Sequence, residues 1–582
     1  MAPRSSLAPY QRNSGGGDNT RNAEVADLLE KLSLLSEAGG EDRFKVIAYR
    51  RASTSVRNLG EAIEEVWKRG DLEKIQFIGG GIAKKIDEYL RTGKLEFLEK
   101  LQRNVPEGAV ELMGVSGIGP RTAYKLAKDN GIKSVAQLKE ALVSGRLADV
   151  LGAVNSKRIL EAVNEAKPAK RRMLLVEANE LSKDIVAYFR QEDVIVESAG
   201  SLRRGKETVG DLDILSVDAK AAKVLVGYPG VDRVIESGPT RTSVFMKNGV
   251  QVDIRVVKKT QYGAAMIYFT GSKDHNIALR NIAISKGWTL NEYGLDDLNT
   301  EKTIAGETER QVYKKLGLEY IQPELREARG EIDAAREGKL PDLVEVGDLR
   351  GDLQMHSTWS DGSDELETMA RAAKERGYEY VAFTDHSVSI GVANGLSEER
   401  FRKQWKVIDE LNDELKPFRI LKSVEAEVRS DGSLDYDATF FENFDIVGAS
   451  IHQSFRQSPE KLTGRAIRAL NNPAVNILFH PTNRMIGQRE GNPIDLPKVI
   501  KTAKDLGKML EIDGSPNRLD LDDVWARRAM EEGVILSIDS DAHGTGELEN
   551  VDYGVTVARR AWLEKKDVLN TLSLKSLLKK LH

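Results

Sequence analysis

The sequence contains no cysteine, and this absence excludes several kinds of site. Disulfide bonds, zinc sites with thiolate ligands and cysteine nucleophiles cannot occur in the chain. Long apolar runs are also missing, since none approaches the roughly 20 residues that a membrane-spanning helix needs. Any bound metal must therefore be held by histidine, carboxylates, carbonyl oxygens or water. We expect a monomer in the cytoplasm with no membrane partner.

At 582 residues the chain is longer than one hydrophobic core usually serves, so we expect three or more domains. Residues 1–19 are rich in proline, serine and glycine and predict a disordered tail. Short amphipathic helices separated by glycines are expected over 20–100 and again over 101–168. Strand-like runs then predict an α+β region. A charged, helix-prone linker is expected at 322–345. Beyond it, over 346–582, short apolar strands alternate with helices, which is typical of an α/β barrel-like domain.

The net charge of -5 conceals an asymmetry between two parts of the chain. Lysine and arginine slightly exceed the acidic residues before residue 341, and the acidic residues exceed them after it. This distribution suits a polyanion binder joined to a metal-binding module, although ordinary surface charge gives the same pattern. Charge alone leaves both interpretations open.

Two glycine-containing turns predict contacts with a nucleic-acid backbone. Gly117 and Gly119 fit the helix-hairpin-helix pattern, in which two glycines let the chain turn tightly close to a phosphate. The following helix then directs its N-terminal N–H groups at that phosphate without reading the base sequence. A second copy contains Gly79 and Gly81, but Phe77 stands where its first glycine is expected. A plain helix–helix turn is the alternative for either copy, and the presence of two copies favours DNA binding.

Three acidic residues predict a site for two metal ions. Asp211 and Asp213 are two apart at the start of an expected strand, so their side chains share one face, and Asp253 lies in a strand that could run beside it. Three carboxylates on one face can hold two Mg²⁺ or Mn²⁺ ions about 4 Å apart for in-line phosphoryl transfer. The preceding turn would supply backbone N–H groups, a hydroxyl and a guanidinium to a triphosphate. Its residues are Gly200, Ser201, Arg204 and Gly210.

These elements, in this order, resemble the family X DNA polymerases over about residues 20–320. The run from Gly200 to Asp213 resembles that family's nucleotidyltransferase signature, and the run from Tyr268 to Tyr293 resembles its nucleotide-binding and thumb segment. The resemblance implies a palm at 169–262 and a thumb at 263–321. It further implies that the incoming nucleotide is bound by Tyr268, Phe269, Gly271 and Asn276, and DNA by Arg255 and Arg280.

The resemblance is less complete in the N-terminal domain. Lys85 falls at the position of the Schiff-base lysine in members with 5′-deoxyribose-phosphate lyase activity, and Lys45 and Tyr49 match positions that bind a 5′-phosphate at a gap. Two further basic positions of that pocket are Gly81 and Phe97 here. Lyase activity is therefore a hypothesis, and a phosphate-binding or merely exposed lysine is the alternative.

The chain has seven histidines, and five of them lie between residues 356 and 543. Each follows a strand-like apolar run or has an acidic neighbour. Together with Asp361 and Glu425 they suit a cluster of Zn²⁺ or Mn²⁺ ions. A buried core histidine is the alternative for any single one, but it fits five in one domain poorly. The five are His356, His386, His452, His480 and His543.

Residues 346–575 resemble the PHP phosphoesterase domain of bacterial and archaeal family X polymerases, from an opening motif at 351–362 to a closing motif at 541–543. Such domains hold three metals with nine ligands. The resemblance implies that eight are present: the seven residues named above and Asp541. The ninth differs, because the opening motif normally reads His-x-His and here reads Gln354-x-His356. A carbonyl oxygen is a weaker ligand than imidazole for Zn²⁺ or Mn²⁺, so we expect partial metal occupancy and a weak or absent nuclease.

The sequence thus predicts a template-directed DNA polymerase that fills short gaps during repair. Its partners would be gapped or primed double-stranded DNA and deoxynucleoside triphosphates, and it would be associated with the nucleoid. The PHP domain would add a 3′→5′ exonuclease or an abasic-site endonuclease if its site works. Two other interpretations remain: a PHP phosphoesterase that its N-terminal region only tethers to DNA, and a non-enzymatic scaffold at DNA ends. The intact Asp211, Asp213 and Asp253 favour the first interpretation.

Overall fold

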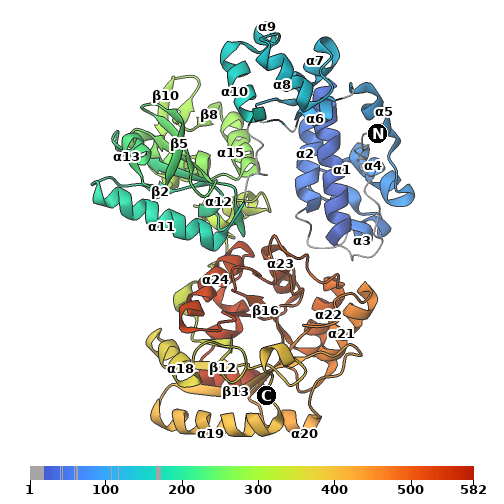
Figure 1. Ribbon diagram of the computed structural model, residues 1–582, viewed down its shortest axis with the longest axis vertical. Coiled ribbons are helices and arrows are strands. Elements are labelled where there is room, and N and C mark those ends of the chain that lie inside the picture. Colours follow the sequence, from blue (N-terminus) through green and yellow to red (C-terminus); the bar gives the residue numbers. More distant parts are fainter. Residues whose placement is uncertain are drawn as a thin grey trace, which may run out of the picture. The chain divides into compact units, whose positions relative to one another are not determined.

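The computed structural model describes residues 19–164 and 172–581, except for 40, 42, 58, 60–62, 107, 114 and 116. Residues 1–18, most of the predicted disordered tail, lie outside the described residues. The chain divides into two compact units, residues 1–170 and 171–582, and each is described by itself (Figure 1). Among the described residues, no helix combines the length and apolarity that crossing a membrane requires.

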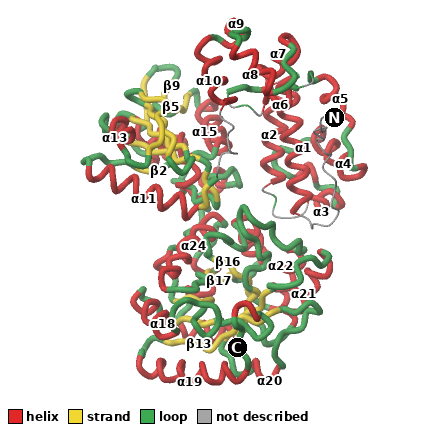
Figure 2. The backbone as a smooth tube through the Cα atoms, viewed as in Figure 1, coloured by secondary structure: helices red, strands yellow, loops and turns green. Residues whose placement is uncertain are grey.

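The first unit is built from helices around one apolar core (Figure 2). The glycines that follow two of its helices, Gly93 and Gly131, have left-handed backbones and end those helices. The helices are α1 Asn19–Ala38, α2 Arg43–Arg57, α3 Ile63–Lys68, α4 Gly80–Thr92, α5 Glu96–Asn104, α6 Ala109–Met113, α7 Pro120–Asn130, α8 Val135–Val143, α9 Ala148–Leu151 and α10 Ala153–Asn164.

The two predicted hairpins have matching backbones despite the missing glycine. Gly117 has a φ of +92°, and α7 begins directly after Gly119. In the other copy Phe77 takes the corresponding place with a φ of +66°, and α4 begins directly after Gly79. A left-handed backbone at a bulky residue costs about 1–3 kcal/mol, so the surrounding helices hold this turn against local strain. The Phe77 ring lies under the guanidinium of Arg51, 5.2 Å from its centroid.

The region expected as the palm contains a five-stranded sheet. The elements of this region are β1 Met173–Leu174, α11 Leu175–Gln191, β2 Glu197–Ser198, α12 Gly200–Arg203, β3 Thr208–Val209, β4 Asp211–Ser216, α13 Ala221–Gly227, β5 Val231–Ser237, β6 Arg241–Met246 and β7 Gln251–Val256. The strands β1 and β3 pair with each other in a separate sheet. The strand order is β2-β4-β7-β6-β5, and β4 and β7 run parallel. Leu212 and Ile214 of β4 and Val252 and Ile254 of β7 are buried in the core that α11 and α13 help to form. The residues between them therefore face the other side of the sheet.

The region expected as the thumb follows directly. Its elements are α14 Tyr262–Thr270, α15 Lys273–Ser285, β8 Trp288–Asn291, β9 Gly294–Asp297, β10 Lys302–Ala305 and α16 Glu309–Leu316. The three strands form an antiparallel sheet in the order β10-β9-β8. The expectation from the sequence did not include these strands, because each has only four residues.

The segment at 322–345, for which the sequence predicts a linker, is packed into the fold. It contains α17 Glu331–Glu337, and three of its apolar residues, Leu325, Ala335 and Leu343, belong to the same core as α14–α16. Its charged Arg326 is fully buried and donates a 2.7 Å hydrogen bond to Glu309. Composition indicated a charged, helix-prone linker because it does not reveal that these charges have partners elsewhere in the chain.

The C-terminal region is a parallel seven-stranded barrel with helices around it. Its strands follow chain order: β11 Gly351–Met355, β12 Tyr380–Phe383, β13 Arg419–Glu427, β14 Ile446–Ser450, β15 Ile477–Leu478, β16 Met509–Asp513 and β17 Leu536–Asp539. Its helices are α18 Leu366–Glu375, α19 Glu398–Glu414, α20 Ala438–Phe441, α21 Pro459–Asn471, α22 Leu496–Leu506, α23 Asp523–Glu532, α24 Val551–Arg560 and α25 Leu574–Leu581. This confirms the predicted α/β barrel-like class.

Buried carboxylates help to close this barrel between its first and last strands. The Leu353 N–H donates to Asp539 at 2.8 Å, and the Ser540 N–H donates to Asp352 at 3.2 Å. Carboxylate side chains thus replace some of the backbone hydrogen bonds that would otherwise join the first and last strands. Because all strands are parallel, their C-terminal ends meet at one edge of the barrel.

Two candidate metal centres

The three acidic residues of the palm converge on the face of its sheet opposite the core that α11 and α13 help to form. Asp211 and Asp213 both belong to β4, and Asp213 lies directly opposite Asp253 of the parallel strand β7. Leu212 and Ile214 point into the core on the opposite face, so alternation alone aims the acids outward. The structure therefore brings the three predicted carboxylates together.

This group of carboxylates has the electrostatics of a cation site. Burial, together with the charges of Asp211 and Asp253, raises the pKa of Asp213 to about 7. A carboxyl group that ionises with such difficulty gains from a nearby divalent cation. Gly200 is required beside it, because a Cβ there would lie 2.5 Å from a carboxylate oxygen of Asp213, at a φ of +65°. The donor set, oxygen only, suits Mg²⁺ or Mn²⁺.

Two polar residues that the sequence did not single out hold Asp253 in place. The Ser243 hydroxyl on β6 donates to one of its carboxylate oxygens, and the Gln251 amide donates to the other at 2.9 Å. Ser243 lies opposite Asp253 in the antiparallel pairing of β6 and β7. The sequence around Ser243 gives no signal for this role, because Arg241 and Thr242, which precede it in the strand, are also polar.

Among the residues assigned to nucleotide and DNA binding by resemblance, Tyr268 and Phe269 belong to α14, Asn276 and Arg280 belong to α15, and Arg255 belongs to β7. Tyr268 and Phe269 form an edge-to-face pair with centroids 5.0 Å apart, and the Asn276 amide donates to the Tyr268 carbonyl at 2.7 Å. Arg280 lies over the Tyr268 ring at 5.6 Å, and Arg255 lies over Phe269 at 5.1 Å. These contacts place both guanidinium groups beside aromatic faces. A cavity of about 500 Å³ is lined in part by Arg255 and Phe269.

Arg204 is fixed by residues from the thumb and from the predicted linker. Its Nε donates to Glu327 at 3.0 Å and its Nη1 donates to the Thr270 carbonyl at 2.5 Å. Gly271 is close to the same guanidinium, since a Cβ at that position would lie 3.3 Å from Nη1. Ser201 is half-buried in the same turn, and Gly210 directly precedes β4. The predicted triphosphate turn thus lies next to the carboxylates.

In the first unit, Lys85, Lys45 and Tyr49 lie close together. The Lys85 ammonium lies 5.8 Å from the Tyr49 ring centroid and 4.8 Å from that of Phe97. Burial and the charge of Lys45 lower the pKa of Lys85. Phe97, which replaces a basic residue of the expected pocket, thus covers the lysine instead of adding charge. The predicted hairpin glycines Gly79, Gly81, Gly117 and Gly119 also belong to this unit.

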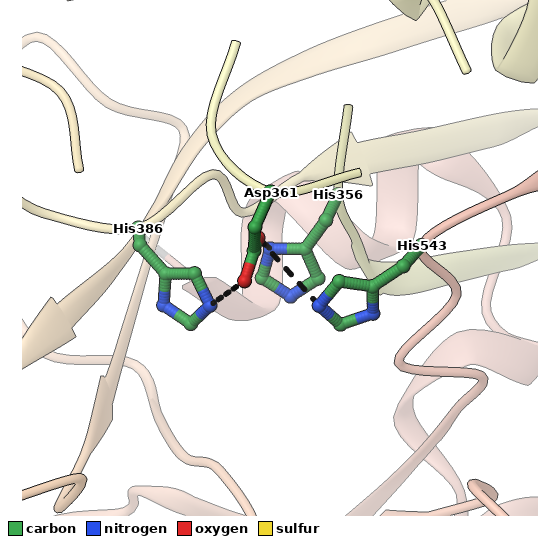
Figure 3. A group of neighbouring side chains, drawn as sticks. All are labelled: His356, Asp361, His386 and His543. Atoms are coloured by element: carbon green, nitrogen blue, oxygen red, sulfur yellow. Dashed lines mark ion pairs between the residues drawn. The ribbon is translucent and has the colours of Figure 1, made fainter. Parts of the chain in front are cut away.

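The histidine cluster lies at the C-terminal ends of the barrel strands. His356 follows β11, His386 follows β12 and His543 follows β17 (Figure 3). Glu425 belongs to β13. Asp361 lies between two of these rings, 3.4 Å from His386 and 3.6 Å from His543. Residues far apart in the sequence therefore converge because parallel strands end at one edge.

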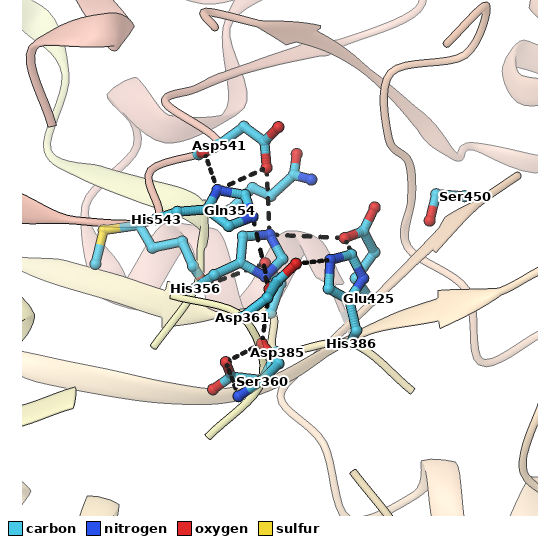
Figure 4. Close-up of polar contacts among 12 residues, drawn as sticks. Gln354, His356, Ser360, Asp361, Asp385, His386, Glu425, Ser450, Asp541 and His543 are labelled. Atoms are coloured by element: carbon cyan, nitrogen blue, oxygen red, sulfur yellow. Dashed lines mark hydrogen bonds and ion pairs between the residues drawn. The ribbon is translucent and has the colours of Figure 1, made fainter. Parts of the chain in front are cut away.

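Glu425 is the centre of the cluster. Its carboxylate lies 3.1 Å from His386, 3.6 Å from His356, 3.3 Å from His452 and 2.8 Å from His480. Figure 4 shows His356 between Glu425 and Asp541, whose carboxylate is 3.2 Å from the ring. All eight predicted ligands are thus adjacent to at least one other member of the set.

These residues fit a group of divalent cations. Both ring nitrogens of His356 and one carboxylate oxygen of Glu425 are buried without a hydrogen-bond partner. Burial opposes protonation of His386, but Glu425 and Asp361 outweigh it and raise its pKa to about 9. The negative charge that favours a proton on His386 also favours a metal cation. A bound metal ion would displace the proton and use the neutral imidazoles as ligands. Nitrogen donors suit Zn²⁺ or Mn²⁺.

Gln354 stands at the position of the missing histidine, and its side chain is fully buried against Glu511. The amide and the carboxylate form a 3.0 Å hydrogen bond when the amide is oriented with its nitrogen towards Glu511. Asp385 and Ser360 are two further residues beside the cluster that the sequence did not single out. Asp385 accepts a 2.6 Å hydrogen bond from Ser360 and so fixes the loop before Asp361 (Figure 4).

Four parts of the chain match known protein families. Residues 20–95 match a helix-hairpin-helix domain, and residues 109–165 match a SAM-like helix-hairpin-helix tandem. Residues 265–327 match the DNA polymerase beta thumb, and residues 352–475 match the PHP domain. The thumb match extends to residue 327, which agrees with the burial of Leu325 and Arg326 in the thumb core.

Similarity to individual proteins covers nearly the whole chain. The chain is 39% identical over 561 residues to the DNA polymerase/3′-5′ exonuclease PolX of Bacillus subtilis (strain 168), covering 95% of this chain and 98% of that protein. It is 25% identical over 340 residues to DNA polymerase lambda of Rattus norvegicus, covering 53% and 56%. A probable phosphatase of Thermoanaerobacter sp. (strain X514) is 31% identical over 212 residues, 35% of this chain and 82% of that protein. The first alignment spans both metal centres.

Proposed function

Since this chain belongs to the family X DNA polymerases that carry a C-terminal PHP domain, we propose that it fills short gaps in DNA by template-directed nucleotidyl transfer. The observation that carries the proposal is the pairing of β4 with β7, in which Asp213 faces Asp253 with Asp211 on the same face. This arrangement suits a primer 3′-hydroxyl that attacks the α-phosphate of a deoxynucleoside triphosphate, with pyrophosphate leaving.

In this proposal the chain's own residues orient the substrate. Asp211, Asp213 and Asp253 would hold Mg²⁺ or Mn²⁺, which supplies charge neutralisation and activates the 3′-hydroxyl. Arg204, already oriented by two hydrogen bonds, would bind the triphosphate together with the Ser201 hydroxyl and the Gly200 N–H group. The edge-to-face pair Tyr268 and Phe269 would support the sugar, with Asn276 at the base. Arg255 and Arg280 would contact DNA strands.

Primer extension on a duplex with a short gap tests this function. The parent chain should extend the primer with Mg²⁺ or Mn²⁺, and Asp211→Ala should reduce the rate at least 1,000-fold, roughly what removal of an essential catalytic group costs. A replacement of an exposed acid outside the site, Asp232→Ala, is the matched control. If the parent does not extend a primer, a tethered phosphoesterase or a DNA-end scaffold replaces our proposal.

The two helix-hairpin-helix turns would hold the DNA backbone near the gap. Gly117 and Gly119 give close approach to a phosphate, and the matching turn at Phe77 supports a second contact of the same kind. Because such contacts are to phosphates, affinity should fall steeply with salt. We propose that the protein is a monomer and that it is associated with the nucleoid. A sedimentation measurement of the chain with and without gapped DNA checks the oligomeric state.

For the PHP domain we propose a 3′→5′ exonuclease or abasic-site endonuclease of low activity. Its eight ligands, holding Zn²⁺ or Mn²⁺, support phosphodiester hydrolysis. Gln354, engaged with Glu511, leaves one ligand position without imidazole. The chain's similarity to a protein named DNA polymerase/3′-5′ exonuclease favours the exonuclease. Digestion of a single-stranded 3′ end by the Asp211→Ala variant isolates this activity from extension.

Lys85 supports one secondary activity, a 5′-deoxyribose-phosphate lyase. Its pKa is lowered by burial and by Lys45, which increases the neutral amine needed for a Schiff base. Borohydride should trap a covalent adduct between the parent and a 5′-deoxyribose-phosphate end. Lys85→Ala should lose the adduct and Lys84→Ala, its neighbour on α4, should keep it. Equal trapping by both variants leaves Lys85 as a phosphate-binding residue.

A further inference from the structure

Helix α24 of the PHP domain also packs against the palm. Val551, Val555 and Ala558 are buried in the PHP core, which gives the helix one apolar face. Tyr553 packs against both the PHP core and the palm core. On the same side, Thr556 lies so close to Gly205 that a Cβ there would overlap its methyl group. One helix thus supports the barrel and touches the turn that would bind a triphosphate.

Arg560, the last residue of α24, makes the closest polar contacts with that turn. Its guanidinium is 3% exposed and donates to the Arg204 carbonyl at 2.6 Å. The same group donates to Glu327 at 3.1 Å and to Asp523 of α23 at 2.7 Å. Arg560 therefore connects the PHP domain with both the backbone of Arg204 and the carboxylate that holds its side chain.

Glu327 is the common partner of three cations. Its Oε1 accepts from Arg204 at 3.0 Å and from Arg560 at 3.1 Å, and lies 3.6 Å from the Lys206 ammonium. Burial opposes ionisation, but these three charges lower the pKa of Glu327 to about 2, so it stays anionic. Arg329 adds a fourth cation through Asp523, at 3.0 Å. Glu327 and Asp523 thus hold four basic side chains next to the turn proposed to bind a triphosphate.

We propose that Arg560 is a positioning residue for binding of the deoxynucleoside triphosphate, so that the PHP domain completes the polymerase site. It acts through Glu327 and the Arg204 carbonyl, which together fix the direction of the Arg204 guanidinium. A group oriented before the substrate arrives binds it with less loss of freedom. The inference rests on the proposed function, because it assigns Arg204 to the triphosphate.

Arg559 provides a matched control on the same helix end. It also forms an ion pair outside the PHP barrel, with Glu324 at 2.8 Å, and donates to the Val344 carbonyl at 3.1 Å. These partners belong to the segment 322–345, and none of them is in the turn at 200–205. Arg559→Gln therefore removes an equivalent ion pair without touching Arg204.

The experiment uses the full-length chain on gapped DNA. We expect Arg560→Gln to raise KM for the deoxynucleoside triphosphate about tenfold or more, the usual effect of removing an orienting partner, with kcat changed much less. Arg559→Gln should leave KM within about twofold. Arg560→Lys should fall between parent and Arg560→Gln, because an ammonium cannot reproduce the fork that contacts three partners. Equal KM values for Arg559→Gln and Arg560→Gln would overturn the proposal.

Two further measurements keep the outcome decisive. If Arg560→Gln unfolds at a lower temperature than Arg559→Gln, Glu327→Gln replaces it. That variant keeps the Arg560 contact with the backbone but removes the carboxylate charge that holds the Arg204 side chain, and it should also raise KM about tenfold. Equilibrium binding of a Mg²⁺–deoxynucleoside triphosphate is measured beside extension. If the parent binds nucleotide but does not extend, the proposed function fails, while weaker binding by Arg560→Gln still supports the coupling and unchanged binding refutes it.

Discussion

The two metal centres of this protein differ in how the backbone gathers their ligands. In the palm, Asp213 and Asp253 are register partners on two neighbouring parallel strands, and their side chains lie side by side on one face of the sheet. In the PHP domain, single residues such as His356, His386 and His543 come one from each strand end. The palm thus offers a few oxygen donors on one face of a sheet, and the barrel offers many nitrogen donors at the ends of its strands. In both centres the way the strands are arranged decides which donor atoms meet.

The centres also differ in what holds the ligands without a metal. Asp253 has Ser243 and Gln251 as hydrogen-bond donors, so its position does not depend on a cation. Glu425 is surrounded mainly by histidine rings, some of whose nitrogens have no hydrogen-bond partner. We therefore expect exchangeable ions in the palm and more tightly held ions in the PHP domain, except at the position of Gln354, where we expect partial occupancy.

The largest expected effect separates the two centres completely. Glu425→Gln removes the charge that four histidine rings approach, so metal affinity of the PHP domain should fall more than about 100-fold, beyond the usual effect of an outer partner. Exonuclease activity should disappear with it. Metal content by mass spectrometry and digestion of a 3′ end measure both. Gap filling should stay within about twofold, and a parallel loss of extension would show that the centres are not independent.

A second change tests the preorganised palm. Ser243→Ala removes the donor to Asp253, and we expect the Mg²⁺ concentration for half-maximal extension to rise about 10–100-fold. Ser237→Ala, on the neighbouring strand, is the control and should behave as the parent. The metal content of the PHP domain should not change. An unaltered Mg²⁺ requirement would mean that Gln251 alone holds the carboxylate.

A third change makes the PHP centre more complete. Gln354→His should restore an imidazole next to Glu511 and raise both the metal affinity at that position and the exonuclease rate about tenfold. Gln354→Ala, which offers no ligand, should leave them at or below the level of the parent. Digestion of a labelled 3′ end at limiting Mn²⁺ measures the difference. If the parent digests the end as fast as the histidine variant, Gln354 does not limit the nuclease.

The smallest expected effect is a pH dependence confined to the palm. The pKa of Asp213 is raised to about 7, so below that pH a proton occupies the carboxylate and Mg²⁺ must displace it. For one competing proton, the Mg²⁺ requirement of extension should be about tenfold higher at pH 6 than at pH 8. Extension at saturating Mg²⁺ should differ less between the two pH values. A requirement that is flat over this range would contradict the raised pKa.

Much of both sites could be predicted from the sequence. The spacing of Asp211 and Asp213 fixes a common face, and an apolar run before each histidine fixes its place at a strand end. What could not be predicted are contacts between polar residues on different elements. Nothing local to Ser243 shows that β6 pairs with β7 in the register that reaches Asp253. Likewise, the charged residues at 322–345 indicated a linker because their buried partners, such as Glu309 for Arg326, lie elsewhere in the chain.

By itself, then, the sequence determined which chemical groups are present and which side of each strand or turn they occupy, because these depend on backbone periodicity and on nearest neighbours. Only the tertiary structure decided which distant charges meet. The position of Arg560 beneath Arg204 and the engagement of Gln354 with Glu511 are examples. Such pairs depend on how helices and strands pack as whole bodies, and this packing is set by the sum of many apolar contacts.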